Sequence, residues 1–268
     1  MINGEWALVF FTLITQMCVG AFIFQEILIP RKSHNLALLA MMIIAVLLSF
    51  FHLGKPGNAI HSLNNLGSSW LSREILMLSI FTILLAFTTI ADRSNPGKTI
   101  FLRITSILTM IAGLTVVFSM PMIYMMKTIP VWNSMATLLE FLSCTVILGG
   151  MLILLLSGRM MQEENLFKRN QKIILVVILF LIADISNSAY SFMHYREFEM
   201  VQGWIPVSGI IKIVLHFIAL LVLLFLFKSF MKNKKLANSW IIAMFTIILL
   251  SEIIGRHAFY ASYMSPGV

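Results

Sequence analysis

The sequence predicts an all-α integral membrane protein, a bundle of eight transmembrane helices. Of its 268 residues, 59% are hydrophobic and only 11% are charged, and the mean hydropathy is +0.94. Soluble proteins do not have this composition. Apolar runs of about 20 residues, the length that crosses a bilayer, follow one another with short polar gaps. Runs such as LALLAMMIIAVLLSFF and IILVVILFLIA are apolar on every face, which favours helices over the alternating strands of a membrane β-barrel.

In order along the sequence, we expect spans at residues 6–29, 36–53, 74–91, 101–126, 132–156, 173–194, 207–227 and 239–262. The first run has no basic region before it and no Ala-x-Ala site, so we expect a span and not a removable signal peptide. Residues that end or begin helices separate the runs: Pro30, Gly54 with Pro56, SNPG at 94–97, Pro130 and Pro206. Residues 1–268 are therefore expected to form a single transmembrane domain.

The basic residues predict the orientation of the spans. One side of the predicted bundle receives Arg31, Lys32, Arg93, Lys98, Arg103, Arg159, Lys168, Arg169, Lys172, Lys228, Lys232, Lys234 and Lys235. The other side receives Lys55, Arg73, Lys127 and Arg196. By the positive-inside rule the first side is cytoplasmic, so both termini and the loop after the second span face outward, to the periplasm of a bacterium.

Other features exclude several function classes. The net charge of +8 is spread over short loops beside apolar runs, which argues against a nucleic-acid surface. Cys18 and Cys144 lie inside apolar runs without a CxxC or Cys/His spacing, which argues against iron-sulfur clusters, structural zinc and a disulfide framework.

Ionisable side chains within spans are costly and mark candidate functional sites. We expect two of them, Asp184 and His216, near the middle of the membrane. Gln16 is the comparable neutral residue of the first span. The remaining ionisable candidates fall in the outer halves of their spans: His52, Glu74, Glu140, His194, Lys212, Glu252, Arg256 and His257.

Each candidate also has a structural alternative. Glu252 and Arg256 are four residues apart and are expected to form an ion pair on one helix face. Lys212 is equally compatible with snorkelling outward. His194 is expected to be an interfacial anchor, and Asp184, with Ser186, Asn187 and Ser188, to form interhelical hydrogen bonds.

His52 differs from the other candidates, because Gly54, Pro56 and Gly57 follow it and interrupt the backbone hydrogen bonding there. A ligand can therefore approach the imidazole. A histidine and carboxylates at the edge of the bilayer suit a lipid-soluble substrate that must release protons into water, such as a quinol.

Residues 52–75, HLGKPGNAIHSLNNLGSSWLSREI, resemble the HLGSP...A..SL.N.G.S.LS.EI pattern of the DmsC family, the membrane anchor subunits of anaerobic dimethyl sulfoxide reductases. YMMKTIPVWNS at 124–134 resembles the Y...TVPTW.S loop of that family, and EIIGRHAFY at 252–260 resembles its E..GR..FY segment. More broadly, the sequence resembles quinol-interacting subunits of the NrfD and PsrC type.

The resemblance implies a complex with a molybdopterin catalytic subunit and a four-cluster iron-sulfur subunit on the periplasmic side of the inner membrane. The anchor would oxidise menaquinol and hold no haem, iron-sulfur cluster or metal, and it would not perform the terminal reduction. The resemblance assigns quinol oxidation to His52 and Glu74.

Six further residues are expected in quinol binding or a proton path: Gln16, Glu140, His194, Lys212, Glu252 and Arg256. Those expected to dock the partner are Gly54, Pro56, Asn64, Asn65, Gly67, Trp70, Pro130 and Trp132.

Two other functions stay open at this point. Paired histidines on facing spans could ligate a haem b in a quinol-oxidising anchor. Eight spans with buried charges could also form a secondary transporter, although paired broken helices are missing and the polar residues concentrate near one surface.

Overall fold

The computed structural model describes residues 2–28, 34–52, 63–94, 100–157, 164–196, 204–233 and 238–262, and these are almost entirely helical. The elements are α1 (Ile2–Leu28), α2 (Asn35–His52), the short 3-10 helix η2 (Leu63–Asn65), α4 (Trp70–Ser94), α5 (Ile100–Tyr124), α6 (Met135–Ser157), α7 (Glu164–Arg196), α8 (Trp204–Asn233) and α9 (Asn238–Ala261). No strand occurs in the described ranges, so the all-α prediction is confirmed there.

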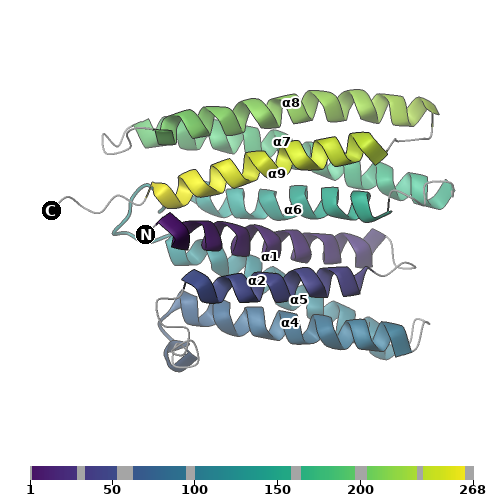
Figure 1. The fold of residues 1–268 in the computed structure, drawn as a ribbon, viewed down its shortest axis with the longest axis horizontal. Helices are drawn as coiled ribbons and strands as arrows, with labels where there is room; N and C mark the ends of the chain where they lie inside the picture. Colours follow the sequence, from purple (N-terminus) through teal and green to yellow (C-terminus); the bar gives the residue numbers. More distant parts are fainter. Residues whose placement is uncertain are drawn as a thin grey trace.

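Seven of these helices are long and apolar enough to cross a membrane. They are α1, α4, α5, α6, α7, α8 and α9. The apolar part of α2 is shorter, Asn35–Phe50, although the helix lies parallel to its neighbours in Figure 1. The structure thus accounts for seven of the eight predicted spans by length and composition.

Several helix ends differ from the predicted span ends. α6 begins at Met135, three residues after the approximate start expected for this span, and Trp132 lies in the preceding loop. α7 begins at Glu164 and α8 continues to Asn233, well beyond the apolar runs. The extra turns of α7, ENLFKRNQK, consist mostly of good helix formers, and hydropathy detects only the part of a helix that matches the bilayer.

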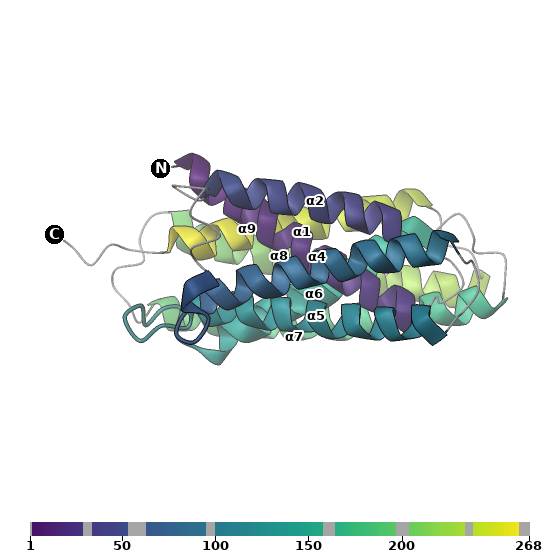
Figure 2. The ribbon, with the colours of Figure 1, turned by 90° about the horizontal axis from the view of Figure 1, so that it is seen from below.

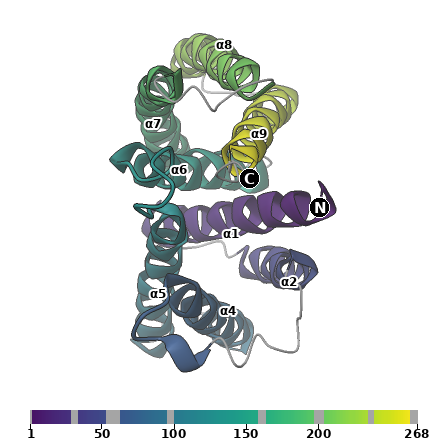
Figure 3. The same ribbon diagram turned by 90° about the vertical axis from the view of Figure 1, so that its left-hand side faces the viewer.

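The described helices form two four-helix bundles, and these lie back to back (Figure 3). In the first bundle α1, α2, α4 and α5 pack in a ring, and in the second α6, α7, α8 and α9 do the same. The bundles meet mainly where α1 packs on α6. Accordingly, 78% of the apolar window of α1 and 67% of that of α6 is buried, against 33% to 44% in the other candidate spans.

Two glycines allow α1 and α6 to approach closely. A Cβ on Gly20 would collide with the backbone of Thr145 and Gly149, and one on Gly149 would collide with the backbone of Gly20. Small residues at such crossings let helix backbones touch in membranes, where dispersion contacts drive association. The bundle interface therefore depends on glycine at both positions.

The start of α1, the end of α9, the segment η2 and the start of α6 all lie at one end of the molecule, on the left in Figures 1 and 2. We call this end the entry end. α1 ends and α5 begins at the opposite end of the molecule, which we call the far end. α2 ends and α4 begins at the entry end.

Candidate functional site

The interior of the second bundle contains a cluster of charged side chains, with at least one member from each of its four helices. We call it the charged cluster; it comprises Glu140 of α6, Asp184 of α7, Lys212 and His216 of α8, and Glu252 and Arg256 of α9. Every member is at most 9% exposed. Charges buried this deeply must be paired.

Lys212 is the centre of the cluster. Its Nζ lies 3.2 Å from Oε1 of Glu140, 3.3 Å from Oδ2 of Asp184 and 3.6 Å from Oε2 of Glu252. A Cβ on Gly255 would meet the Lys212 side chain, so that glycine provides the space for it. The lysine therefore does not snorkel outward, and this alternative is wrong.

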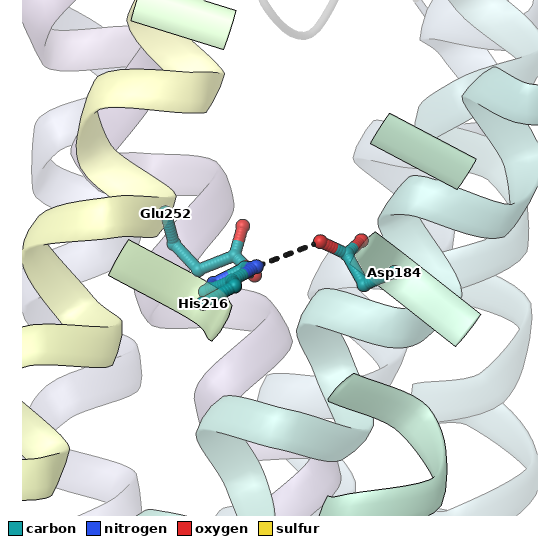
Figure 4. Close-up of side chains that lie close together, drawn as sticks. All are labelled: Asp184, His216 and Glu252. Carbon is teal, nitrogen blue, oxygen red and sulfur yellow. Dashed lines mark ion pairs between the residues drawn. The ribbon is translucent and has the colours of Figure 1, made fainter. Parts of the chain in front are cut away.

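His216, one turn after Lys212, lies between two of the same carboxylates (Figure 4). Its Nδ1 is 3.0 Å from Oδ2 of Asp184, and its Nε2 is 3.6 Å from Oε1 of Glu252. Both ring nitrogens therefore face a carboxylate. Asp184 also accepts a hydrogen bond of 3.4 Å from Ser188, while Asn187 donates to the carbonyl of Ala136 on α6. The predicted interhelical bond in this segment is confirmed for Asn187.

Arg256 points from the second bundle toward the first. Its Nη2 donates to Oε1 of Gln16 on α1 at 3.2 Å, and its guanidinium lies 3.6 Å over the ring of Phe141. Gln16 in turn donates to the carbonyl of Phe141 at 2.7 Å. Although both side chains are described, no ion pair joins Glu252 and Arg256. The prediction of that pair is wrong: Glu252 lies against Lys212, and Arg256 donates to Gln16 on another helix.

Glu74 lies in the first bundle, in the second turn of α4, and is 6% exposed. Two tyrosines, Tyr124 at the end of α5 and Tyr260 near the end of α9, lie within electrostatic range of its carboxyl group. The tyrosine rings are 5.4 Å apart, and the hydroxyl of Tyr260 donates to Oγ1 of Thr12 at 3.2 Å. These tyrosines are functional candidates that sequence analysis did not assign, although both stand in segments that resemble the DmsC family.

His52 is the last residue of α2, and its side chain lies outside the described part of the structure, as do Gly54 and Pro56. α2 packs against α4. Because α2 ends and α4 begins at the entry end, the backbone of His52 lies at the same end as Glu74 (Figure 1). His194 lies near the end of α7, apart from Asp184, with its ring stacked on Tyr190 at 6.0 Å.

Part of the predicted docking surface is exposed at the entry end. Asn64, Asn65 and Gly67 are exposed around η2, and Arg73 donates to the carbonyls of Leu66 and Gly67 at 2.9 and 2.7 Å. The guanidinium of Arg73 also lies 4.5 Å from the ring centre of the partly exposed Trp70. Arg73 therefore holds this loop in place, and the loop exposes backbone groups and the side-chain amides of Asn64 and Asn65.

The two remaining docking candidates lie in the loop before α6. Pro130 is exposed, whereas Trp132 is buried. The indole of Trp132 donates to the carbonyl of Phe259 at 3.1 Å and to Oγ of Ser262 at 2.9 Å. Its ring therefore holds the loop against the end of α9 and is not itself available to a partner.

The donor atoms of Asp184, His216 and Glu252 lie within 4.8 Å of one another, close enough to hold a metal ion. However, the ammonium of Lys212 lies beside two of these three residues and already supplies a cation. A divalent ion would place like charges next to each other in an apolar interior. The residues present do not fit a metal centre.

The family model of the DMSO reductase anchor subunit (DmsC) matches residues 1–262. The protein belongs to the DmsC family. It is similar to the C chain of the anaerobic dimethyl sulfoxide reductase of Escherichia coli, with 26% identity over 98% of the present sequence and 96% of that relative. This family membership and the apolar helices make it a multi-pass membrane protein.

Two further relatives match over part of their length. The C chain of the anaerobic dimethyl sulfoxide reductase of Haemophilus influenzae is 33% identical, over 55% of the present sequence and 56% of that relative. The YnfH chain of an anaerobic dimethyl sulfoxide reductase of Escherichia coli is also 33% identical, over 55% and 56%. The matched region thus spans about half the length of each of these two relatives.

Proposed function

We propose that this protein is the membrane anchor of a bacterial respiratory complex of the dimethyl sulfoxide reductase type and that it oxidises menaquinol at the entry end. Its partners are an iron-sulfur subunit, which receives the electrons, and through it a molybdopterin catalytic subunit. The DmsC membership and the similarity to the C chain of known dimethyl sulfoxide reductases support this assignment.

The observation that carries the proposal is the carboxyl group of Glu74, buried within two turns of the entry end and next to the helix that ends in His52. A buried carboxylate is costly and is kept where a function needs it. A quinol head group that enters from the lipid between α2 and α4 would meet both residues. Tyr124, on the neighbouring helix α5, extends this polar site.

The chemistry is the loss of two protons and two electrons from the quinol. His52 accepts the first hydroxyl proton, because a neutral imidazole is a good base near neutral pH. Glu74 accepts the second, and both protons leave to water at the entry end. The two electrons pass to an iron-sulfur cluster of the partner, and the resulting quinone returns to the lipid. No haem or metal in this anchor is required.

The proposed orientation places the entry end in the periplasm and the far end in the cytoplasm of a bacterial inner membrane. The excess of lysine and arginine near the far end supports this orientation. We include α2 as the eighth span, since its 18 residues extend about 27 Å, close to the hydrocarbon thickness of about 30 Å. Both termini are then periplasmic.

The exposed loop at Asn64, Asn65 and Gly67 would dock the iron-sulfur subunit, together with Pro130 of the neighbouring loop. Both loops lie at the entry end, the same end as Glu74. A cluster of the partner would therefore sit above the quinol site, which keeps the electron path short.

The test is a His52→Ala variant of the assembled complex, compared under two electron donors. We expect electron transfer from a menaquinol analogue to stop, while an artificial donor that feeds the catalytic subunit directly supports the normal rate. Normal turnover with the menaquinol analogue would remove His52 from the mechanism.

A further inference from the structure

Pro121 lies inside α5, about one turn before that helix ends at the entry end. Proline has no backbone N–H, so the carbonyl of Val117, four residues earlier, lacks the hydrogen bond that continues an α-helix. Val117 is 0% exposed, and Pro121 is buried as well. A buried carbonyl in a membrane needs a donor from the protein or a ligand, because lipid supplies none. α5 therefore carries a backbone acceptor that its regular hydrogen-bond pattern does not satisfy.

The packing around Gly113 shows which helices this part of α5 faces. A Cβ on Gly113 would meet Val19 of α1 at 3.0 Å and Phe81 of α4 at 3.1 Å. Val117 and Pro121 follow Gly113 by four and eight residues, so all three lie on one face of α5. The freed carbonyl is therefore on the side of α5 that packs on α1 and α4, in the interior of the first bundle (Figure 3).

The same contacts give the depth of the freed carbonyl. α1 and α4 run from the entry end to the far end, and α5 runs back (Figure 1). Seven residues from these contacts toward the entry end, about 10 Å along each helix, lie Thr12, Glu74 and Met120. Val117 and Pro121 are on either side of this level, and helix carbonyls point to the C-terminal end, here the entry end. The freed carbonyl thus points toward the layer that contains the carboxyl group of Glu74.

The hydroxyl groups near this layer donate to other acceptors. Ser119 donates to the carbonyl of Val116 at 2.8 Å, and Thr12 donates to the carbonyl of Leu8 at 3.0 Å. The hydroxyl of Tyr260 donates to Oγ1 of Thr12 at 3.2 Å. Serine and threonine side chains commonly satisfy the carbonyls that a proline frees in transmembrane helices. These three side chains do not, which leaves the freed carbonyl available to a ligand.

Given the proposed quinol site at Glu74, on which this inference rests, we propose that the carbonyl of Val117, freed by Pro121, accepts a hydrogen bond from the quinol and makes the site prefer quinol to quinone. A head group that enters between α2 and α4 faces α5 across the ring of helices (Figure 3). One hydroxyl group then meets two acceptors at the same depth. The carboxyl group of Glu74 takes its proton, whereas the carbonyl of Val117 only holds the hydroxyl.

A carbonyl acceptor distinguishes the two redox forms of the ligand. A quinol has two O–H donors, whereas the quinone that remains after the loss of two protons and two electrons has only carbonyl oxygens. The freed carbonyl accepts a hydrogen bond from the first and repels the second. A site built to pair with a hydroxyl group rejects an analogue that lacks it, because a buried polar group is then left unpaired. The freed carbonyl thus favours binding of the substrate and release of the product.

The Pro121→Ala variant removes the acceptor, because alanine restores the N–H that bonds to Val117. Alanine is a strong helix former, so the variant should unfold at a midpoint at least as high as that of the wild type. In the assembled complex, we expect KM for a soluble naphthoquinol to rise about threefold to tenfold, the effect of one hydrogen bond, with kcat little changed. The inhibition constant of the corresponding naphthoquinone should not rise.

Two further variants are the controls. Pro121→Gly also restores the N–H but adds no side chain, so an equal rise in KM in both variants assigns the effect to the N–H. Thr115→Ala changes an exposed position of the same helix and should keep the wild-type KM. In the wild-type complex, the naphthoquinol should bind more tightly than the naphthoquinone. The opposite preference would overturn the proposal without any variant.

An unchanged KM for the naphthoquinol in Pro121→Ala would also overturn the proposal. So would equal rises in this KM and in the inhibition constant of the naphthoquinone, because they would show that Pro121 only shapes the helix. In both cases Glu74→Gln would still slow turnover, and the proposed function would stand. Normal turnover in Glu74→Gln would instead remove the proposed function and this proposal with it.

Discussion

At the scale of single residues, the indole of Trp132 holds the loop before α6 on the end of α9. It stacks on Phe259 at 5.2 Å and makes two hydrogen bonds to the α9 end. Tyr124 packs edge-on against the same indole. Tyr124 also lies within electrostatic range of Glu74, so this aromatic group lies between the loop and the proposed quinol site.

Replacing Trp132 with phenylalanine keeps an aromatic ring but removes the donor to Phe259 and Ser262. We expect a loss of about 1–3 kcal/mol of stability, because two buried hydrogen bonds are lost and the Ser262 oxygen is left without its donor, although the Phe259 carbonyl keeps the hydroxyl of Ser262. Thermal unfolding in detergent measures it as a lower midpoint. Trp240→Phe, at a side chain that is 51% exposed, is the control and should not change the midpoint. Equal midpoints for both variants would show that the indole bonds contribute nothing.

Among the residue-level predictions, the structure confirms an interhelical hydrogen bond for Asn187. The local sequence does not determine that Lys212 is buried or which residue pairs with Arg256. The (i, i+4) spacing of Glu252 and Arg256 describes a single helix, whereas Gln16, the actual partner, is 240 positions away in sequence. Side chains in a bundle choose partners across helices, and that choice depends on packing that the sequence pattern does not encode.

At the scale of elements, the contact of α1 with α6 joins the two bundles through the facing glycines Gly20 and Gly149. Hydropathy identified both helices as spans. It gave no sign that they are the central ones, because a lipid-facing helix and a buried one are equally apolar. The helix α6 starts three residues after the approximate span start, since an apolar loop residue such as Trp132 extends an apolar run without extending the helix.

Gly149→Ala should destabilise the protein, because the new methyl group meets the backbone of Gly20 and Ala21 and neither can move aside as a side chain would. Overpacking of this kind typically costs about 1–3 kcal/mol. The unfolding midpoint of the purified protein measures the effect. Gly209→Ala is the control, since its added Cβ meets only Phe192 at an ordinary 3.6 Å. A Gly149→Ala variant as stable as Gly209→Ala would contradict the close crossing.

At the scale of the whole molecule, composition was enough to predict a helical membrane protein, and the family resemblance covered nearly the whole sequence. The division into two four-helix rings was not predictable from hydropathy, because it depends on which helices touch. This division places Glu74 in the first bundle and the charged cluster in the second, and Arg256 of the cluster reaches Gln16 of the first bundle.

The proposed orientation predicts the labelling of single added cysteines. The native Cys18 and Cys144 are both 0% exposed and should not react with a thiol reagent. In intact spheroplasts, a membrane-impermeant thiol reagent should label Asn64→Cys, at the exposed entry end, and should not label Ser94→Cys, exposed at the opposite end of α4. Ser94→Cys should react only after the membrane is permeabilised. The reverse pattern would place the entry end in the cytoplasm.

The central claim is that Glu74 takes part in quinol oxidation, and single-turnover reduction of the iron-sulfur clusters by a menaquinol analogue tests it most directly. In the assembled complex with Glu74→Gln, which keeps shape but cannot accept a proton as a carboxylate does, we expect the rate to fall about 100-fold or more. The clusters should still be reduced normally by dithionite. The control Ser79→Ala, an exposed position on the same helix, should keep the wild-type rate. A wild-type rate in Glu74→Gln would contradict the account.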